Sequence, residues 1–106
     1  MSDFPFRATI LIPVYNVEKY LDGCISSLKE QTEPFENMEI LLINDGSRDG
    51  SADICRRLAD ENENVCFYSK ENEGLSKTRN FGLRRARGKY IFFLDSDDTL
   101  APDTVK

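Results

Sequence analysis

Three carboxylates crowd into four residues directly after an apolar run near the end of the sequence. Residues 90–94 read YIFFL, and Asp95, Asp97 and Asp98 follow them. An apolar, aromatic run of this length is typical of a strand covered on both faces, as in a parallel sheet. Carboxylates this close repel one another unless a cation lies between them. The pattern predicts a divalent cation site at the carboxyl end of a strand, although DSDD alone equally fits a helix cap and its neighbours.

Two further polar segments follow apolar runs earlier in the sequence. They are PVYN at residues 13–16 and NDGS at residues 44–47. Because the carboxyl ends of parallel strands meet at one edge of a sheet, we expect both segments to lie beside the carboxylates, in a crevice that binds a ligand. Pro13 and Tyr15 offer flat apolar surface and Asp45 offers a hydrogen-bond acceptor; a nucleoside diphosphate needs both together with a cation. Taken singly, NDGS is typical of a turn and Tyr15 of an aromatic side chain packed at a rim.

The hydrophobic pattern predicts the elements that position these residues. Strand-like apolar runs occupy residues 8–13, 38–44, 64–69 and 89–94. Between them, apolar residues recur at spacings of three and four, which predicts helices over residues 17–28, 52–59 and 75–86. Gly88 is expected to stop the last helix. This alternation predicts an α/β fold in one domain over residues 1–106, with a mostly parallel sheet, right-handed crossovers and helices on both faces.

The composition excludes several kinds of function. The chain has no histidine, so neither a Ser-His-Asp triad nor a histidine-based metal site can be assembled. Its net charge of −5 argues against nucleic acid as a partner. We expect no membrane span and no signal peptide, and hence a cytoplasmic protein or the cytoplasmic piece of a larger one. Cys24, Cys55 and Cys66 form no CxxC pair, which predicts reduced, mostly buried thiols.

The predicted helix that precedes the last strand carries polar residues but no phosphate-loop motif. GLSKT at residues 74–78 lacks the GxxxxGK[ST] spacing, and the sequence contains no GxGxxG. Arg79 falls on the apolar stripe of this predicted helix. An arginine at that position can bind an anionic partner. It is equally consistent with a side chain that packs its apolar stem on the helix and extends its guanidinium to the surface.

Four ordered blocks of the sequence resemble the family 2 glycosyltransferases, which transfer sugars from nucleotide-sugar donors. The blocks are TILIPVYNVEKYL at residues 9–21, EILLINDGSRDGS at 39–51, ENEGLSKTRNFGL at 71–83 and GKYIFFLDSDD at 88–98. The resemblance covers nearly the whole chain, and four blocks in order are far more specific than any one of them. It implies the Rossmann-like N-terminal half of a glycosyltransferase A-type fold, an Asp-x-Asp motif that holds Mn²⁺ or Mg²⁺, and transfer with inversion at the sugar carbon.

The resemblance also implies how the nucleotide of the donor would bind. Pro13 and Tyr15 would lie against the base, and Asp45 would accept its ring N–H, as this family does with uracil or a similar pyrimidine. The donor is therefore expected to be a nucleotide-diphosphate sugar, with a UDP-sugar as the first expectation.

A second group of roles concerns the metal and the rest of the donor. Asp95 would lie near the ribose and the metal, and Asp97 would bind the metal directly. On the donor side, Gly74 would permit close approach of the backbone, and Arg79 and Asn80 match a charged and polar pair. The cation would neutralise the diphosphate as it departs.

The acceptor side of the reaction is expected to lie outside this chain. In the family, the general base lies well beyond the Asp-x-Asp motif, so we expect the catalytic base beyond Lys106 and none within residues 1–106. The chain is expected to end before the acceptor-binding half. We expect it alone to bind donor without turnover, as part of an enzyme that acts on a saccharide or lipid-linked acceptor in the cytoplasm or at the inner face of the membrane.

Two alternatives stay open at this point. One is a nucleotidyltransferase of sugar metabolism, although the glycine- and arginine-rich loop expected after its first strand is replaced here by PVYNVEK. The other is a non-catalytic domain that only binds a nucleotide or a partner.

Overall fold

Strands and helices alternate along the chain, as predicted. The structure is a computed structural model, and it describes residues 5–95. The elements in order are β1 (Phe6–Val14), α1 (Leu21–Lys29), the short 3-10 helix η1 (Phe35–Asn37), β2 (Met38–Asp45), α2 (Ser51–Glu61), β3 (Val65–Lys70), α3 (Leu75–Leu83) and β4 (Gly88–Phe93). Each strand end lies within about two residues of its predicted position.

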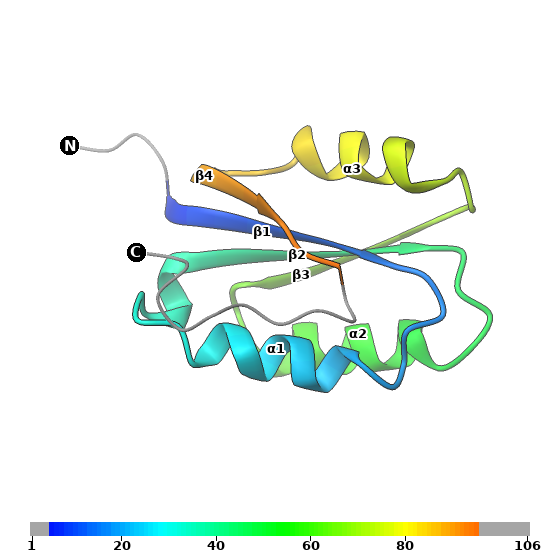
Figure 1. The fold of residues 1–106 in the computed structure, drawn as a ribbon, viewed down its shortest axis with the longest axis horizontal. Helices are drawn as coiled ribbons and strands as arrows, with labels where there is room; N and C mark the ends of the chain where they lie inside the picture. The colour runs from blue at the N-terminus through cyan, green and yellow to red at the C-terminus, as the bar shows by residue number, and fades with distance from the viewer. Residues whose placement is uncertain (1–4, 96–106) are drawn as a thin grey trace.

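The four strands form one parallel sheet in the order β3-β2-β1-β4. Helices α1 and α2 cover one face of the sheet and α3 covers the other (Figure 1). The chain moves outward from β1 through β2 to β3 and then crosses back to add β4 on the other side of β1, so the strand order reverses there. Ligands of open α/β sheets bind at such a reversal, outside the carboxyl ends of the strands. The predicted fold class is confirmed.

The two central strands form the core of the sheet. Strand β2 is buried along its whole length, and residues 8–12 of β1 are fully buried. Helices on both faces remove these strands from water, which explains why they are continuous apolar runs in the sequence. Their carboxyl ends are therefore anchored, and they hold the residues that follow in fixed positions.

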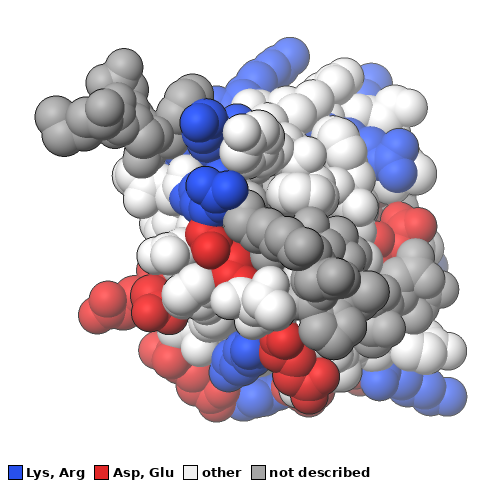
Figure 2. Space-filling model, turned by 60° about the vertical axis from the view of Figure 1, so that its left-hand side comes forward, with Lys and Arg blue, Asp and Glu red and all other residues white. Residues whose placement is uncertain are grey.

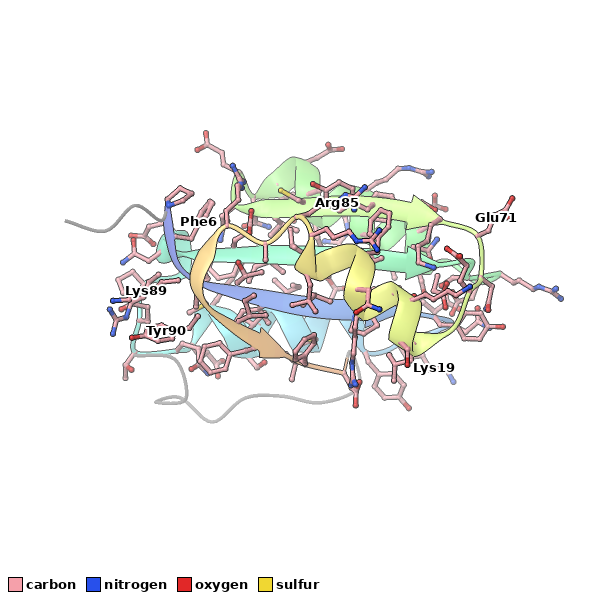
Figure 3. The ribbon with its side chains drawn as sticks, turned by 90° about the horizontal axis from the view of Figure 1, so that it is seen from above. Phe6, Lys19, Glu71, Arg85, Lys89 and Tyr90 are labelled. Atoms are coloured by element: carbon pink, nitrogen blue, oxygen red, sulfur yellow. The ribbon has the colours of Figure 1, made fainter. Side chains whose placement is uncertain are left out.

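Strand β4 is not covered on both faces, contrary to the prediction. Among the described strands it pairs only with β1 and forms an edge of the sheet. Tyr90, Ile91 and Phe93 are 49%, 39% and 46% exposed, and Lys89 and Tyr90 lie at the outer border of the sheet (Figure 3). An apolar run shows that a strand can be buried, but burial also requires a neighbour on its outer side. None of the elements within residues 5–95 supplies one.

The helix before β4 ends earlier than predicted, and Gly88 does not stop it. Helix α3 ends at Leu83, whereas the apolar spacing extended the prediction to residue 86. Gly88 is instead the first residue of β4, and it donates its backbone N–H to Thr9 Oγ1 at 2.8 Å. A Cβ at residue 88 would lie 2.3 Å from the backbone nitrogen of Thr9. Glycine is required here because β4 passes close to β1.

A buried carboxylate ties together the amino ends of three strands. Glu39 of β2 is 1% exposed. It accepts hydrogen bonds from Thr9 Oγ1 of β1 at 2.9 Å, and from N and Nε of Arg87, just before β4, at 2.7 and 2.6 Å. A buried charge is stable only with such partners. This cluster fixes where β4 starts, at the end of the sheet opposite the ligand-binding edge.

The three cysteines are mostly buried and form no disulfide among the described residues, as predicted. Cys24 and Cys55 are buried and Cys66 is half-buried. Burial, helped by the charge of Asp49, raises the pKa of Cys55 to about 12. Because the thiolate is the reactive form, we expect iodoacetamide at pH 8 to alkylate Cys66 first in the native protein. Peptide mass spectrometry should find the other two modified only after unfolding in guanidinium; equal native rates for all three would contradict the packing of α1 and α2 on the sheet.

Charged side chains of both signs are scattered over the face shown in Figure 2. Lys and Arg side chains lie there among Asp, Glu and uncharged side chains. The described residues on that face form no single basic surface of the kind that binds a nucleic-acid backbone. Among residues 5–95, none of the helices has the length and apolar character needed to cross a bilayer.

Candidate functional site

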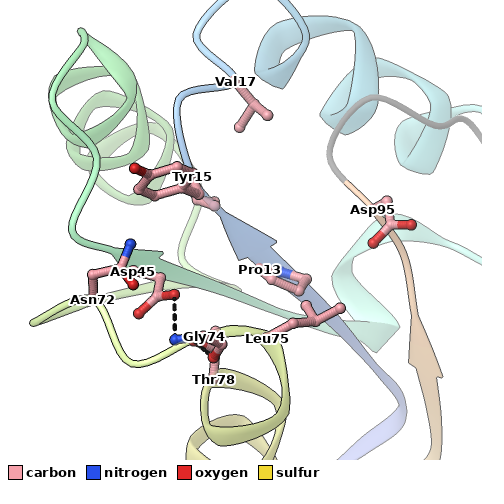
Figure 4. A pocket seen from close by; sticks show the side chains of 10 residues that line it. Pro13, Tyr15, Val17, Asp45, Asn72, Gly74, Leu75, Thr78 and Asp95 are labelled. Atoms are coloured by element: carbon pink, nitrogen blue, oxygen red, sulfur yellow. Dashed lines mark hydrogen bonds between the residues drawn. The ribbon is translucent and has the colours of Figure 1, made fainter.

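The carboxyl edge of the sheet contains a pocket of about 440 Å³. It lies between the ends of β1 and β2, the start of α3 and the segment that follows β4 (Figure 4). Five of the six residues predicted to bind the donor nucleotide line this pocket, and the sixth, Arg79, does not. The lining residues are Pro13, Val14, Tyr15, Val17, Asp45, Asn72, Gly74, Leu75, Thr78 and Asp95. The structure thus brings PVYN, NDGS and the first carboxylate after β4 to one site.

The loop after β1 is fastened to the loop after β2. Asn16 has a positive φ of 52°, which asparagine tolerates better than most residues. Its Oδ1 accepts the N–H of Arg48 at 2.8 Å, and its own N–H donates to Ser47 Oγ at 3.0 Å. Residues 15–20 form this loop, so α1 begins at Leu21 rather than at the predicted residue 17. The contacts fix the backbone that carries Tyr15.

NDGS is a turn and also a wall of the pocket. Gly46 has a φ of 75°, and the Asn44 side-chain oxygen accepts the N–H of Ser47, three residues on, at 3.1 Å. Asp45 lies within this turn as the last residue of β2 and faces the pocket. The two interpretations of the motif are therefore compatible, because the turn holds the carboxylate in place.

Asp45 is a buried carboxylate with three hydrogen-bond donors. It is 6% exposed. Its Oδ1 accepts from Lys70 Nζ at 2.8 Å and from Glu73 N at 2.9 Å, and its Oδ2 accepts from Gly74 N at 3.1 Å. Burial by itself raises the pKa of Asp45, but the hydrogen bond and charge of Lys70 together with the two backbone N–H groups lower it overall. Asp45 is therefore ionised and can only accept.

Gly74 joins the loop after β3 to α3 in a conformation that favours glycine. Its φ and ψ of 93° and 166° lie in a region used almost only by glycine. A Cβ at this position would meet no atom within 4 Å, so the space next to the Gly74 Cα, which lines the pocket, is open. The Gly74 carbonyl accepts both the backbone N–H and the Oγ1 hydroxyl of Thr78. Bare backbone therefore forms this side of the pocket, as close approach of a ligand requires.

Apolar side chains separate the two carboxylates of the pocket. Tyr15 and Leu75 are each 48% exposed. Figure 4 shows Asp45 and Asp95 on opposite sides, with Pro13 and Leu75 between them. Such an arrangement offers a flat apolar surface flanked by an acceptor at one end and a carboxylate at the other. It suits a ligand with a planar ring and an anionic tail when a divalent cation bridges that tail to the carboxylate.

Arg79 does not line this pocket. Its guanidinium lies 5.2 Å from the ring centroid of Phe93 in β4, in a cation–π contact. Its Nε is buried and has no hydrogen-bond partner among the described residues. Asn80 is exposed and lines a separate groove on the outer side of α3. Neither residue lines the pocket between the ends of β1 and β2, and their roles on the donor side stay predictions.

The predicted metal site lies partly outside the described residues. Asp95 is exposed and lines the pocket, whereas Asp97 and Asp98 are not described. Within residues 5–95 no three side chains are placed to hold a metal ion together. The oxygens of the exposed Asp95 carboxylate are ligands suited to Mg²⁺ and Mn²⁺.

The predicted position of the catalytic base also lies outside the described residues. The base is expected beyond Lys106, and the last residue that the structure describes is Asp95. Its placement therefore stays a prediction.

The sequence of the chain matches the model of a known protein family. The family model for glycosyl transferase family 2 matches residues 9–106. The chain belongs to glycosyltransferase family 2. This membership favours a glycosyltransferase over the nucleotidyltransferase alternative, in agreement with the four sequence blocks.

Two curated relatives of this family 2 chain are bacterial. Glycosyltransferase GlyA of Streptococcus pneumoniae is 42% identical over 100 residues, which is 94% of this chain and 14% of GlyA. The minor teichoic acid biosynthesis protein GgaB of Bacillus subtilis is 42% identical over 106 residues, which is 99% of this chain and 12% of GgaB. The chain therefore spans about a seventh or less of the length of these relatives.

Solved structures share the fold of this family 2 domain. S. aureus TarS 1-349 in complex with UDP superposes with a TM-score of 0.84 at 30% identity, over 93% of this chain and 30% of that one. The mannosyltransferase PcManGT from Pyrobaculum calidifontis, in complex with GDP-Man and Mn²⁺, gives a TM-score of 0.80 at 24% identity, over 92% of this chain and 29% of that one. The expected glycosyltransferase A-type fold is confirmed.

The family 2 pocket includes residues that the sequence interpretation missed. Asn72, Leu75 and Thr78 line it, and Lys70 binds Asp45. A signal for Lys70 was present, because it directly follows the third apolar run and therefore lies at the same carboxyl edge. The carboxyl end of β3 lies at the same edge of the parallel sheet as the ends of β1, β2 and β4.

Proposed function

We propose that this chain is the donor-binding part of a glycosyltransferase that transfers a sugar from a nucleotide-diphosphate sugar to an acceptor hydroxyl. The observation that carries the proposal is the pocket at the reversal of strand order, which joins the buried acceptor Asp45, the aromatic surface of Tyr15 and the exposed carboxylate of Asp95. A base needs the first two, and a cation-bound diphosphate needs the third. The UDP complex of TarS supports a UDP-sugar as the donor.

The nucleotide base would bind between the loops that follow β1 and β2. Tyr15 and Pro13 would lie against its plane, and Asp45 would accept its ring N–H. The half-exposed ring of Tyr15 supports this role, since no described aromatic side chain stacks on it. The charge state of Asp45 supports it as well, because an ionised carboxylate can only accept.

A divalent cation, Mn²⁺ or Mg²⁺, fits the residues present at the other end of the pocket. Mg²⁺ in phosphate sites takes one or two carboxylates and completes its shell with phosphate oxygens and water. Asp95 supplies one exposed carboxylate, and we assign Asp97, outside the described residues, as the direct ligand. The chemistry that such a cation supplies is neutralisation of the diphosphate as it leaves the sugar.

The acceptor half of the reaction lies in the part of the enzyme beyond Lys106 in this proposal. Inverting transfer requires a base that deprotonates the acceptor hydroxyl. Two described carboxylates line the pocket, and this proposal assigns neither as the base. Asp45 accepts three hydrogen bonds, and Asp95 belongs to the proposed cation site. The name of GgaB, a minor teichoic acid biosynthesis protein, supports a role in polysaccharide biosynthesis. The acceptor in this proposal is a saccharide or lipid-linked molecule at the cytoplasmic face of the membrane. Sugar transfer by the isolated chain would contradict this placement of the base.

Calorimetric titration of UDP with and without Mn²⁺ tests the proposed function. We expect binding that is strengthened by the metal, and we expect Asp97→Ala to abolish that strengthening because it removes the direct ligand. Asp60→Ala, an exposed aspartate on α2, is the matched control and should behave like the wild type. Binding of UDP with the same affinity in the absence of Mn²⁺, or no binding at all, would contradict the assignment.

A further inference from the structure

Lys70 is a buried lysine whose donors are all used within the wall of the pocket. Its side chain is 8% exposed. The Nζ donates to Asp45 Oδ1 at 2.8 Å, to the Glu71 carbonyl at 3.1 Å and to Glu73 Oε1 at 3.3 Å. An ammonium group has three donor hydrogens, so none is left for a ligand. Any effect of Lys70 on binding must therefore act through its neighbours.

Asp45 keeps one acceptor position open. An ionised carboxylate offers about four lone-pair sites. Lys70 Nζ and Glu73 N occupy both sites of Oδ1, and Gly74 N occupies one site of Oδ2. One site of Oδ2 remains, on a side chain that lines the pocket. A ligand can use it only by donating a hydrogen.

We propose that Lys70 is a positioning residue that determines base specificity, because it holds Asp45 as an acceptor-only carboxylate with one open site. A base that meets this site with its ring nitrogen must then carry a ring N–H. Uracil and guanine have that group, whereas cytosine and adenine present a lone pair on the corresponding ring nitrogen. This inference rests on the proposed function, since it places a base against Asp45.

The charges around Asp45 show why Lys70 is needed for this selection. Burial favours the protonated form of Asp45, which would be a donor and could bind cytosine, and Lys70 counters it. The other charged groups near the carboxylate are Glu73 of the adjoining loop, Lys77 of α3, which lies 3.9 Å from Glu73, and Asp95 across the pocket. Without Lys70, the acidic Glu73 would remain near Asp45, and no lysine of the described residues would contact Asp45.

A comparison of UDP with CDP isolates this effect, because the two nucleotides differ only at positions 3 and 4 of the base. Dissociation constants are measured calorimetrically in Mn²⁺ for the full chain. We expect the wild type to prefer UDP by about 100-fold. Lys70→Met should reduce this preference to less than about tenfold, and Lys70→Arg, which keeps the charge and donors, should restore most of it.

Lys77→Met is the matched control, since Lys77 also pairs with Glu73 but is 70% exposed and does not contact Asp45. It should leave the ratio unchanged. If Lys70→Met loses affinity for UDP and CDP by the same factor, Lys70 has only a structural role and the inference is overturned. If circular dichroism shows that this variant does not fold, Lys70→Gln replaces it.

Titration of the wild-type chain distinguishes a failure of the base restriction from a failure of the proposed function. If it binds UDP and CDP equally well, the base restriction is overturned while donor binding stands. If it binds neither UDP nor GDP, the proposed function itself is overturned.

Discussion

Replacing Asp45 with asparagine is expected to weaken UDP binding by roughly 10- to 150-fold, because a hydrogen bond to a charged group contributes about 1.5–3 kcal/mol. Asp45 already accepts from Lys70, Glu73 and Gly74, through both carboxylate oxygens. An asparagine has one acceptor oxygen, and its amide nitrogen would face one of these donors. The side chain would turn, and the open acceptor site would be lost. Calorimetric titration in Mn²⁺ measures the effect.

The matched control for this variant is Asp53→Asn. Asp53 lies on α2 with its side chain 85% exposed, so the same chemical change should leave the UDP affinity unaltered. The Asp45 variant also deprives the buried Lys70 of its carboxylate, which should lower the free energy of unfolding by about 2–3 kcal/mol. Thermal melting therefore accompanies the titration, which is run well below the transition. A folded variant with wild-type affinity would contradict the role of Asp45.

The substitution Gly88→Ala is expected to lower the free energy of unfolding by about 3 kcal/mol. Its Cβ would lie 2.3 Å from Thr9 N and 2.4 Å from Ala8 C, and these backbone atoms belong to a central strand that cannot move aside. Relief of the clash would also break the hydrogen bond from Gly88 N to Thr9 Oγ1. Since a domain is stable by about 5–15 kcal/mol, urea denaturation should show a large shift of the midpoint.

Gly23→Ala is the control for the added methyl group. Gly23 lies in α1, and a Cβ added there would meet no atom within 4 Å, so alanine should stabilise the protein by up to about 1 kcal/mol through its helix propensity. Because β4 leads directly to Asp95, Gly88→Ala should also weaken the Mn²⁺ dependence of UDP binding. Equal midpoints for the two variants would show that β4 does not approach β1 as closely as the structure indicates.

The positions of the strands were predictable because each central strand is buried on both faces. Strand β2 is buried throughout, and its apolar run has the same limits in the sequence to within one residue. Strand β4 shows the limit of this inference. The sequence of β4 is equally apolar, yet Tyr90 and Phe93 are about half exposed. The hydrophobic pattern indicates which residues a strand can bury, but it does not show whether a neighbouring element is present to bury them.

The convergence of the site was predictable from topology, whereas the detail of its hydrogen bonds was not. A parallel sheet places the carboxyl ends of β1, β2 and β4 at one edge, independently of the loop conformations. This placement alone predicts that Tyr15, Asp45 and Asp95 lie in one pocket, as they do. The side-chain direction of Arg79 depends on the ring of Phe93, far along the sequence. The pairing of Lys70 with Asp45 likewise depends on the register of β3 against β2.

The central claim is that the pocket at the ends of β1 and β2 binds the nucleotide of the donor. Amide chemical-shift mapping of the ¹⁵N-labelled chain with UDP and the diamagnetic Mg²⁺ tests it most directly. The largest shifts are expected at Tyr15, Gly74, Leu75 and Thr78, which line the pocket. Shifts confined to the separate groove of Lys77, Phe81 and Arg84, or no shifts at saturating UDP, would contradict the claim.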